Sequence, residues 1–332
     1  MAETVNRAQM AEDLSSKVFA EFLWQKTGPM NENWTCEQNR KHNAQSHPTD
    51  VVFFYDEPYS AERRYLQCDL KSYSKDSIKR PAITDAIKSL AKQVSCAAMS
   101  EEWQAKYTHK SSMVDISGLL FVYNHDKDFH KSFDNLISDI RPEDIDLPRK
   151  SRLYVLGPAE INWLQRVARE LQQMRGAHDE AEKLPPRERC AFFYPQLVRT
   201  AAVRGERSRA ATMEMLKSPW IVMEHFDEDG ARQGFVIFHR RKTSVEGLMY
   251  LLDYLRRHEM IARKVRIDIK VQPDDGKASA HLQKAVQEFV SNSPGENQDT
   301  EFARRLSKIT ISHVPEILTS YSTTDMGMSY AR

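Results

Sequence analysis

The sequence predicts an α/β protein with a mixed central sheet flanked by helices, followed by a second, smaller α+β domain. Three observations carry this prediction. Strand and helix signals alternate through the first half of the chain, a charged segment with paired prolines then interrupts the apolar pattern, and hairpin signals follow it. A chain of 332 residues has room for two domains of ordinary size.

The first half gives the order helix, strand, strand, helix, strand, helix, strand, which indicates a mixed sheet. Apolar residues at helical spacing predict a first helix over residues 8–25, ended by Gly28-Pro29, and a polar connection follows it. The remaining elements are expected as strands at 51–55, 64–73, 115–123 and 152–156, and as helices starting at Pro81, over 129–140 and over 158–174.

Residues 177–189 are charged and contain Pro185-Pro186, which is typical of a linker. We therefore predict a first domain over residues 1–176, a linker over 177–189 and an α+β domain over 190–332. In that last part we expect strands at 220–226, 234–239, 265–271 and 308–314, a turn at 227–230, and helices at 244–257 and 278–291. The sequence shows no internal repeat.

Composition, cysteine spacing and targeting signals argue against several classes of protein. A formal net charge of +1 gives no global signal for nucleic acid, so attraction to phosphate must come from local basic groups. The four cysteines form no C-x-x-C pair, which argues against a zinc ribbon, and their wide scatter argues against a disulfide framework. The sequence shows neither a signal peptide nor an apolar segment long enough to span a bilayer. We therefore expect a reduced, cytoplasmic protein without membrane contact.

One group of residues has the chemistry of an active site. Asp69 and Lys71 are two apart on a predicted strand, so both point to the same face of the sheet. Asp50 lies at the mouth of the preceding strand, and pairing of the two strands would bring the two aspartates together. Converging carboxylates suit Mg²⁺ or Mn²⁺, to which the backbone carbonyl of Leu70 would add a ligand. Lys71 would orient or deprotonate water and stabilise charge on a phosphorus centre.

Pro48-Thr49-Asp50 followed by Asp69-Leu70-Lys71 resembles the PD-(D/E)xK motif of the restriction-endonuclease-like nuclease superfamily. The element order over roughly residues 8–156 is similar to the core of that superfamily, and the second half of the chain adds nothing to the resemblance. No subfamily is assigned.

The resemblance implies two further site residues. Many members place a glutamate of the first helix in the metal site, and Glu21 has a comparable position. Some place a glutamine on the helix after the lysine strand, and Gln93 matches it. The alternative for both is an ordinary helix surface position. His47 is a candidate for phosphate contact, although a polar loop histidine without a role is the commoner case.

A second D-x-K string, Asp268-Ile269-Lys270, also lies on a predicted strand. No acidic residue stands at a strand mouth at the proper distance before it, because Asp227 and Asp229 belong to a hairpin turn. We therefore interpret the second string as alternating charge on a half-exposed strand. For Asp69-Leu70-Lys71, such a solvated strand face is the alternative to an active site.

The sequence thus predicts a metal-dependent nuclease that hydrolyses phosphodiester bonds of DNA, with RNA as the other substrate. A place in prokaryotic host defence or restriction is implied only by the resemblance. The C-terminal domain would contact a protein partner, a second copy of the chain, a trigger or the substrate. The alternative is a non-catalytic module that keeps the nuclease fold to hold nucleic acid or to assemble with protein.

Overall fold

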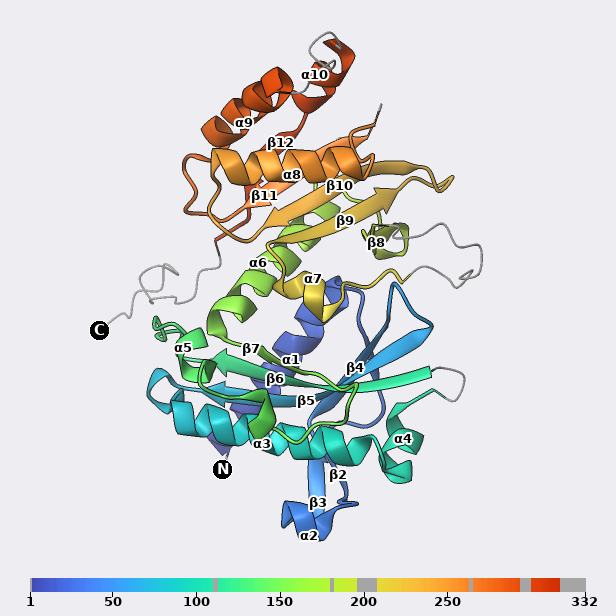
Figure 1. The fold of residues 1–332 in the computed structure, drawn as a ribbon, viewed down its shortest axis with the longest axis vertical. Coiled ribbons are helices and arrows are strands. Elements are labelled where there is room, and N and C mark those ends of the chain that lie inside the picture. The colour runs from blue at the N-terminus through green and yellow to red at the C-terminus, as the bar shows by residue number, and fades with distance from the viewer. Residues whose placement is uncertain are drawn as a thin grey trace, which may run out of the picture.

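The computed structural model describes residues 2–109, 113–179, 182–195, 208–262, 265–292 and 300–316. Within these ranges the chain forms two mixed sheets with a helical layer between them, and further helices cover the outer face of each sheet (Figure 1). The predicted α/β class with a mixed sheet and a second sheet domain is confirmed.

The first sheet has the strand order β1-β4-β5-β6-β7. Its strands are β1 (Gln25–Thr27), β4 (Val51–Asp56), β5 (Glu62–Tyr73), β6 (Met113–Asn124) and β7 (Leu153–Leu156). The pairs β1–β4 and β4–β5 are antiparallel, whereas β5–β6 and β6–β7 are parallel. The helices of this half are α1 (Ala2–Glu21), α3 (Arg80–Ala97), α4 (Glu101–Tyr107) and α5 (Asp134–Ile137), with short 3₁₀ turns at Lys75–Ser77 and Pro142–Asp144.

A small excursion lies between β1 and β4, where the sequence suggested only a polar connection. It consists of β2 (Glu32–Thr35), α2 (Asn39–His42) and β3 (Ser46–Thr49), and β2 pairs with β3 in an antiparallel hairpin. The hairpin runs straight into β4 through Asp50, so its position fixes where that aspartate stands.

The second sheet has the order β8-β9-β10-β11-β12. Its strands are β8 (Cys190–Phe192), β9 (Trp220–Phe226), β10 (Arg232–His239), β11 (Arg266–Val271) and β12 (Thr310–His313). The helices of this half are α6 (Pro158–Arg175), α7 (Met213–Lys217), α8 (Val245–Arg257), α9 (Ala278–Asn292) and α10 (Thr300–Leu306), with a 3₁₀ turn at Arg187–Arg189. Ser244 begins α8 by accepting a hydrogen bond from the NH of Gly247 at 3.0 Å.

The two sheets have the same strand order and the same strand directions. In the second sheet β8–β9 and β9–β10 are antiparallel, and β10–β11 and β11–β12 are parallel, just as in the first. In each sheet a hairpin is followed by crossover connections that carry helices. The hairpin β9–β10 is therefore the structural counterpart of β4–β5, a repeat of topology without a visible repeat of sequence.

Three apolar clusters explain the layers. One joins the first sheet to α3, and another joins the second sheet to α8 and α9. The third lies between the sheets and contains residues of α1, α6 and both sheets. The two halves also exchange hydrogen bonds, since the indole NH of Trp24 donates to the carbonyl of Ala211 at 2.6 Å. The division at residues 177–189 stays a prediction.

Two predicted elements differ from the structure. The helix expected over 129–140 is reduced to α5, because the Asn124 side chain accepts a hydrogen bond from the NH of Phe129 and donates to the carbonyl of Tyr73. Such side-chain bonds to the backbone compete with a helix. The first helix ends at Glu21 rather than at residue 25, because the chain reverses at Leu23 with φ +63° and enters β1.

Candidate active site

The β4–β5 hairpin places the predicted residues at one end of the first sheet. Val51 pairs with Cys68 in the antiparallel register, so Asp50, one step before Val51, lies opposite Asp69. Asp69 and Lys71 share the face of β5 that is turned toward α3, because residues of β5 alternate between the two apolar clusters. The structure therefore brings Asp50, Asp69 and Lys71 together.

Hydrogen bonds fix this arrangement. The NH of Leu70 donates to Oδ2 of Asp50 at 2.6 Å, and Nζ of Lys71 lies 2.7 Å from Oδ1 of Asp69. Asp69 is buried, with 5% of its surface exposed, while the Lys71 side chain is 35% exposed. The lysine thus covers the carboxylates from the solvent side. A metal-ligand role for the Leu70 carbonyl stays a prediction.

The electrostatics of the two carboxylates favour a cation. Burial raises the pKa of Asp50 to about 6; the Leu70 NH opposes the rise, and the charge of Asp69 adds to it. Burial also raises the pKa of Asp69, against the charge and hydrogen bond of Lys71. Burial by itself would lower the pKa of Lys71, but the charge and hydrogen bond of Asp69 and the charge of Asp50 raise it overall. One buried and one half-buried carboxylate thus lie near a single ammonium group, and a divalent ion would relieve that imbalance of charge.

The first helix supplies Glu12 to this region, not the predicted Glu21. The negative charge of Glu12 contributes to the raised pKa of Asp50, and the Asn31 side chain links them by donating to Oε2 of Glu12 at 3.3 Å while its NH donates to the Asp50 carbonyl. Glu21 is fully buried and forms ion pairs with Arg175 and Arg187.

Helix geometry explains this correction. Glu12 and Glu21 are nine positions apart, about two and a half turns, so they point to opposite sides of α1. The positions of Glu12 and Glu21 around the predicted helix, relative to its apolar face, could have favoured Glu12 from the sequence alone.

Gln93 forms its hydrogen bond with Gln67, which lies between Gln93 and the segment that leads to Asp50, rather than with either aspartate or Lys71. It is buried on α3, and its Oε1 accepts a hydrogen bond from Nε2 of Gln67 at 3.0 Å. Gln67 also donates to the carbonyl of Pro48 and accepts from the hydroxyl of Thr49. Gln93 therefore helps to hold the segment that leads to Asp50, and a direct catalytic role for it stays a prediction.

The second D-x-K string is arranged differently. Asp268 of β11 forms an ion pair with Arg266 and accepts a hydrogen bond from Thr310, whereas Nζ of Lys270 lies 2.6 Å from Oε1 of Glu170 on α6. The aspartate and the lysine of this string are thus engaged with separate partners, whereas Asp69 and Lys71 contact each other.

Oxygen ligands arranged in this way suit a hard divalent ion. Asp50 and Asp69 provide carboxylate oxygens at one strand end, and Glu12 adds negative charge nearby. The positions of the two aspartates and of Lys71 are those that the PD-(D/E)xK resemblance predicts.

Comparison with known families agrees with this geometry. Residues 1–160 match the model of a family described as the GAPS4 protein PD-(D/E)XK nuclease domain. This part of the chain is a PD-(D/E)xK nuclease domain. The match covers the first sheet and ends within the first turn of α6. No curated protein and no solved structure matches the chain.

Proposed function

We propose that this chain is a Mg²⁺- or Mn²⁺-dependent nuclease that hydrolyses phosphodiester bonds of DNA, with RNA as the other substrate, in prokaryotic host defence or restriction. One observation carries the proposal. Asp50 and Asp69 lie opposite each other at the mouth of the hairpin in a PD-(D/E)xK nuclease domain, and Nζ of Lys71 lies in contact with Oδ1 of Asp69.

The residues divide the chemistry between them. Asp50 and Asp69 would hold the ion, which supplies Lewis-acid assistance to attack on the phosphodiester when bound. The NH of Leu70 fixes Asp50 through its hydrogen bond, so that carboxylate is oriented before any ligand arrives. Lys71 reaches the same point from the solvent side.

Lys71 acts as a cation in this proposal. Burial lowers the pKa of its ammonium group, but Asp69 and Asp50 raise that pKa overall, so the group is positively charged before an ion binds. An ammonium group at this reach can orient the attacking water and stabilise the negative charge that develops on the phosphate oxygens. The group is half-exposed, so the substrate can approach it from solvent.

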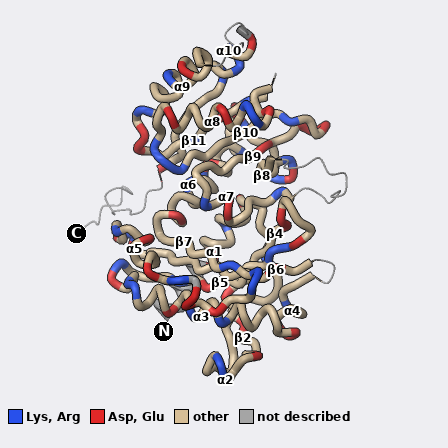
Figure 2. The backbone as a smooth tube through the Cα atoms, in the orientation of Figure 1, with Lys and Arg blue, Asp and Glu red and all other residues tan. Residues whose placement is uncertain are grey.

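Binding of the substrate rests on local contacts. Lys and Arg are interspersed with Asp and Glu along both halves of the chain (Figure 2). Many basic side chains are paired, as Lys75 is with Asp128 and Arg152 with Glu214. We therefore expect few phosphate contacts away from the site and only a modest dependence of affinity on salt.

Contact with a protein partner, a second copy or a trigger is assigned to the C-terminal half. A cavity of about 980 Å³ lies between the halves, and the exposed side chains of Tyr59 and Tyr250 line it together with Trp220. Exposed aromatic side chains around a cavity are typical of recognition sites.

The location of the protein is the remaining part of the proposal. No helix in the described part of the chain has the length and apolar character of a membrane span. All four cysteines have free thiols, which supports a place in the reducing cytoplasm.

The alternative function is a binding or assembly module that keeps the fold without cleaving. It is tested by incubating the purified chain with supercoiled plasmid, single-stranded DNA and RNA, each with Mg²⁺, with Mn²⁺ and with a chelator. Metal-dependent cleavage of DNA supports the proposal. Binding of any of the three without cleavage, while Asp69→Asn leaves that binding unchanged, would replace it with the alternative.

A further inference from the structure

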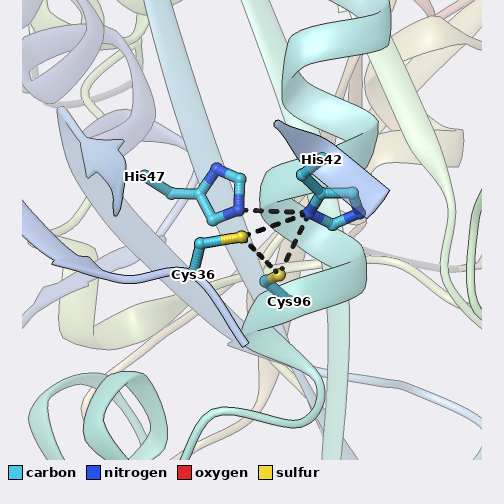
Figure 3. Close-up of side chains that lie close together, drawn as sticks. All are labelled: Cys36, His42, His47 and Cys96. Carbon is cyan, nitrogen blue, oxygen red and sulfur yellow. Dashed lines mark hydrogen bonds between the residues drawn. The ribbon is translucent and has the colours of Figure 1, made fainter. Parts of the chain in front are cut away.

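Four metal-binding side chains outside the nuclease site meet in the interior. Cys36 and His47 come from the β2–β3 hairpin, His42 from α2 and Cys96 from α3, and their sulfur and nitrogen atoms point toward one another (Figure 3). All four residues are at most 5% exposed. One atom of each lies within 4.8 Å of one atom of every other.

The distances match a tetrahedron around a zinc ion. Zn–S bonds of about 2.3 Å and Zn–N bonds of about 2.05 Å at tetrahedral angles give edges of about 3.8 Å for S–S, 3.6 Å for S–N and 3.3 Å for N–N. The structure has 3.7 Å between the Sγ atoms of Cys36 and Cys96 and 3.3 Å between Nδ1 of His42 and Nε2 of His47. Nδ1 of His42 lies 3.5 Å from Sγ of Cys36 and 3.2 Å from Sγ of Cys96.

We propose that Cys36, His42, His47 and Cys96 form a structural zinc site, separate from the divalent-ion site of the nuclease. Two thiolates and two imidazoles are the ligands of structural zinc, and four protein ligands leave no open position for substrate. The nuclease site has oxygen ligands instead, which favour harder ions. The two sites therefore select different metals.

Other pairings of these groups explain the geometry less well. A disulfide between Cys36 and Cys96 requires sulfur atoms about 2.05 Å apart, and the structure has them at 3.7 Å. Hydrogen bonds among two thiols and two imidazoles would be weak, because a thiol is a poor donor and a poor acceptor.

The site fastens the hairpin to the helix behind the sheet. Three ligands lie within residues 36–47, and the fourth lies near the end of α3. Other bonds follow the same path, since Lys92 donates to the carbonyl of His42 at 3.2 Å and Gln38 donates to the hydroxyl of Ser95 at 3.2 Å. His47 stands three residues before Asp50, so an ion here would fix the approach of the chain to the nuclease carboxylate.

The sequence hides this site because its ligands have an unusual spacing. Cys36-x5-His42-x4-His47 contains no C-x-x-C pair, and Cys96 follows only after β4, β5 and most of α3. The lack of a C-x-x-C pair argues only against zinc sites that are built on such pairs. The sequence placed His47 in a polar loop, as a candidate for phosphate contact or as a residue without a role. The structure has it on β3, buried beside Trp34 and His42.

The first test is the metal content of the full chain, purified without added metal or chelator and measured by elemental analysis. We expect about one zinc per chain. Replacement of zinc by Co²⁺ should give the visible absorption of tetrahedral cobalt with thiolate ligands, and thiol titration of the unfolded, unreduced protein should find all four cysteines free. Absence of zinc, octahedral cobalt, or two missing thiols that point to a disulfide would each overturn the proposal.

Variants then assign the ligands. Cys36→Ser and Cys96→Ser should each lower the zinc content at least about tenfold, whereas Cys190→Ser, at a buried cysteine outside the cluster, should retain it. His47→Cys should keep zinc through a third thiolate, which separates loss of a ligand from loss of folding. Asp69→Asn should also keep zinc. Full zinc in Cys36→Ser, or loss of zinc in Cys190→Ser and Asp69→Asn alone, would contradict the assignment.

Discussion

The nuclease half and the C-terminal half repeat one topology, and each carries a D-x-K string, yet the two strings lie on different strands. In the first half the string is on β5, the second strand of the hairpin. In the second half it is on β11, which corresponds to β6. Lys270 of the second string is directed to α6, between the sheets, whereas Asp69 and Lys71 face α3 on the outer side.

The β9–β10 hairpin carries different residues at its open end. Val222 belongs to the cluster under the crossover helices of the second sheet, as Val52 does in the first. The last register pair on that face of β9–β10 is Trp220–His239, where the β4–β5 hairpin has Asp50 opposite Asp69 beyond its last pair.

Arg241 lies two positions after His239, so Trp220, His239 and Arg241 supply no carboxylate at the open end of this hairpin. These three residues line the cavity between the halves. A D-x-K string forms a site only on the right strand, on the right face of the sheet and opposite a suitable residue of the neighbouring strand. The three-residue string itself specifies none of these conditions.

The largest difference between the strings should appear when each aspartate loses its charge. Asp69→Asn removes a ligand of the ion, so we expect DNA cleavage at saturating Mg²⁺ to fall about a thousandfold. Asp268→Asn, the matched change on β11, should leave cleavage within about threefold of the parent chain. Initial rates on plasmid DNA measure both, and equal losses in the two variants would abolish the distinction between the strings.

The two lysines should separate catalysis from stability. Lys71→Met is expected to lower turnover about a hundredfold and leave metal binding largely intact, because it removes only the positioned ammonium group. Lys270→Met should keep turnover but reduce the free energy of unfolding by about 2 kcal/mol, because Glu170 then stays largely buried without its cation. Single-turnover rates and urea unfolding distinguish the two, and parental turnover in Lys71→Met would remove this lysine from the mechanism.

Each string has an acidic neighbour on a helix, but Glu12 on α1 acts on the carboxylate of Asp50, whereas Glu170 on α6 is paired with Lys270. Glu12→Gln should weaken Mg²⁺ binding about twentyfold, the scale for residues that support metal ligands. Glu21→Gln is the control on the same helix: it should leave Mg²⁺ affinity unchanged and lower the melting temperature, since Arg175 loses a charged partner. Isothermal titration and thermal unfolding measure these effects, and the opposite pattern would restore Glu21 to the metal site.

Acid should affect the nuclease site through Asp50. Its pKa is raised to about 6, so the proton is bound more tightly in the folded chain than in the unfolded one, and this stabilisation is lost as the pH rises from about 4 to about 6. Metal needs the ionised form, so Mg²⁺ affinity should increase as the pH rises and fall about tenfold per pH unit below 6. Calorimetric titration between pH 5 and 7 tests this, and a constant affinity would contradict it.

The sequence alone determined the elements and the chemistry of the nuclease motif. Periodicity predicted β4, β5, β6, α6, α8 and the β9–β10 hairpin, because amphipathic spacing is a local property of the chain. The strings Pro48-Thr49-Asp50 and Asp69-Leu70-Lys71 were enough to indicate a PD-(D/E)xK domain, because a strand places residues two apart on one face.

Only the tertiary structure decided which distant residues meet. The rotation of α1 against the sheet places Glu12, and not Glu21, near Asp50. The second D-x-K string lies on β11, which is not a strand of the hairpin. The tertiary structure also brought Cys96 on α3 to Cys36 on the hairpin. Contacts of this kind depend on how helices and strands pack across many intervening residues, and local spacing carries no record of that packing.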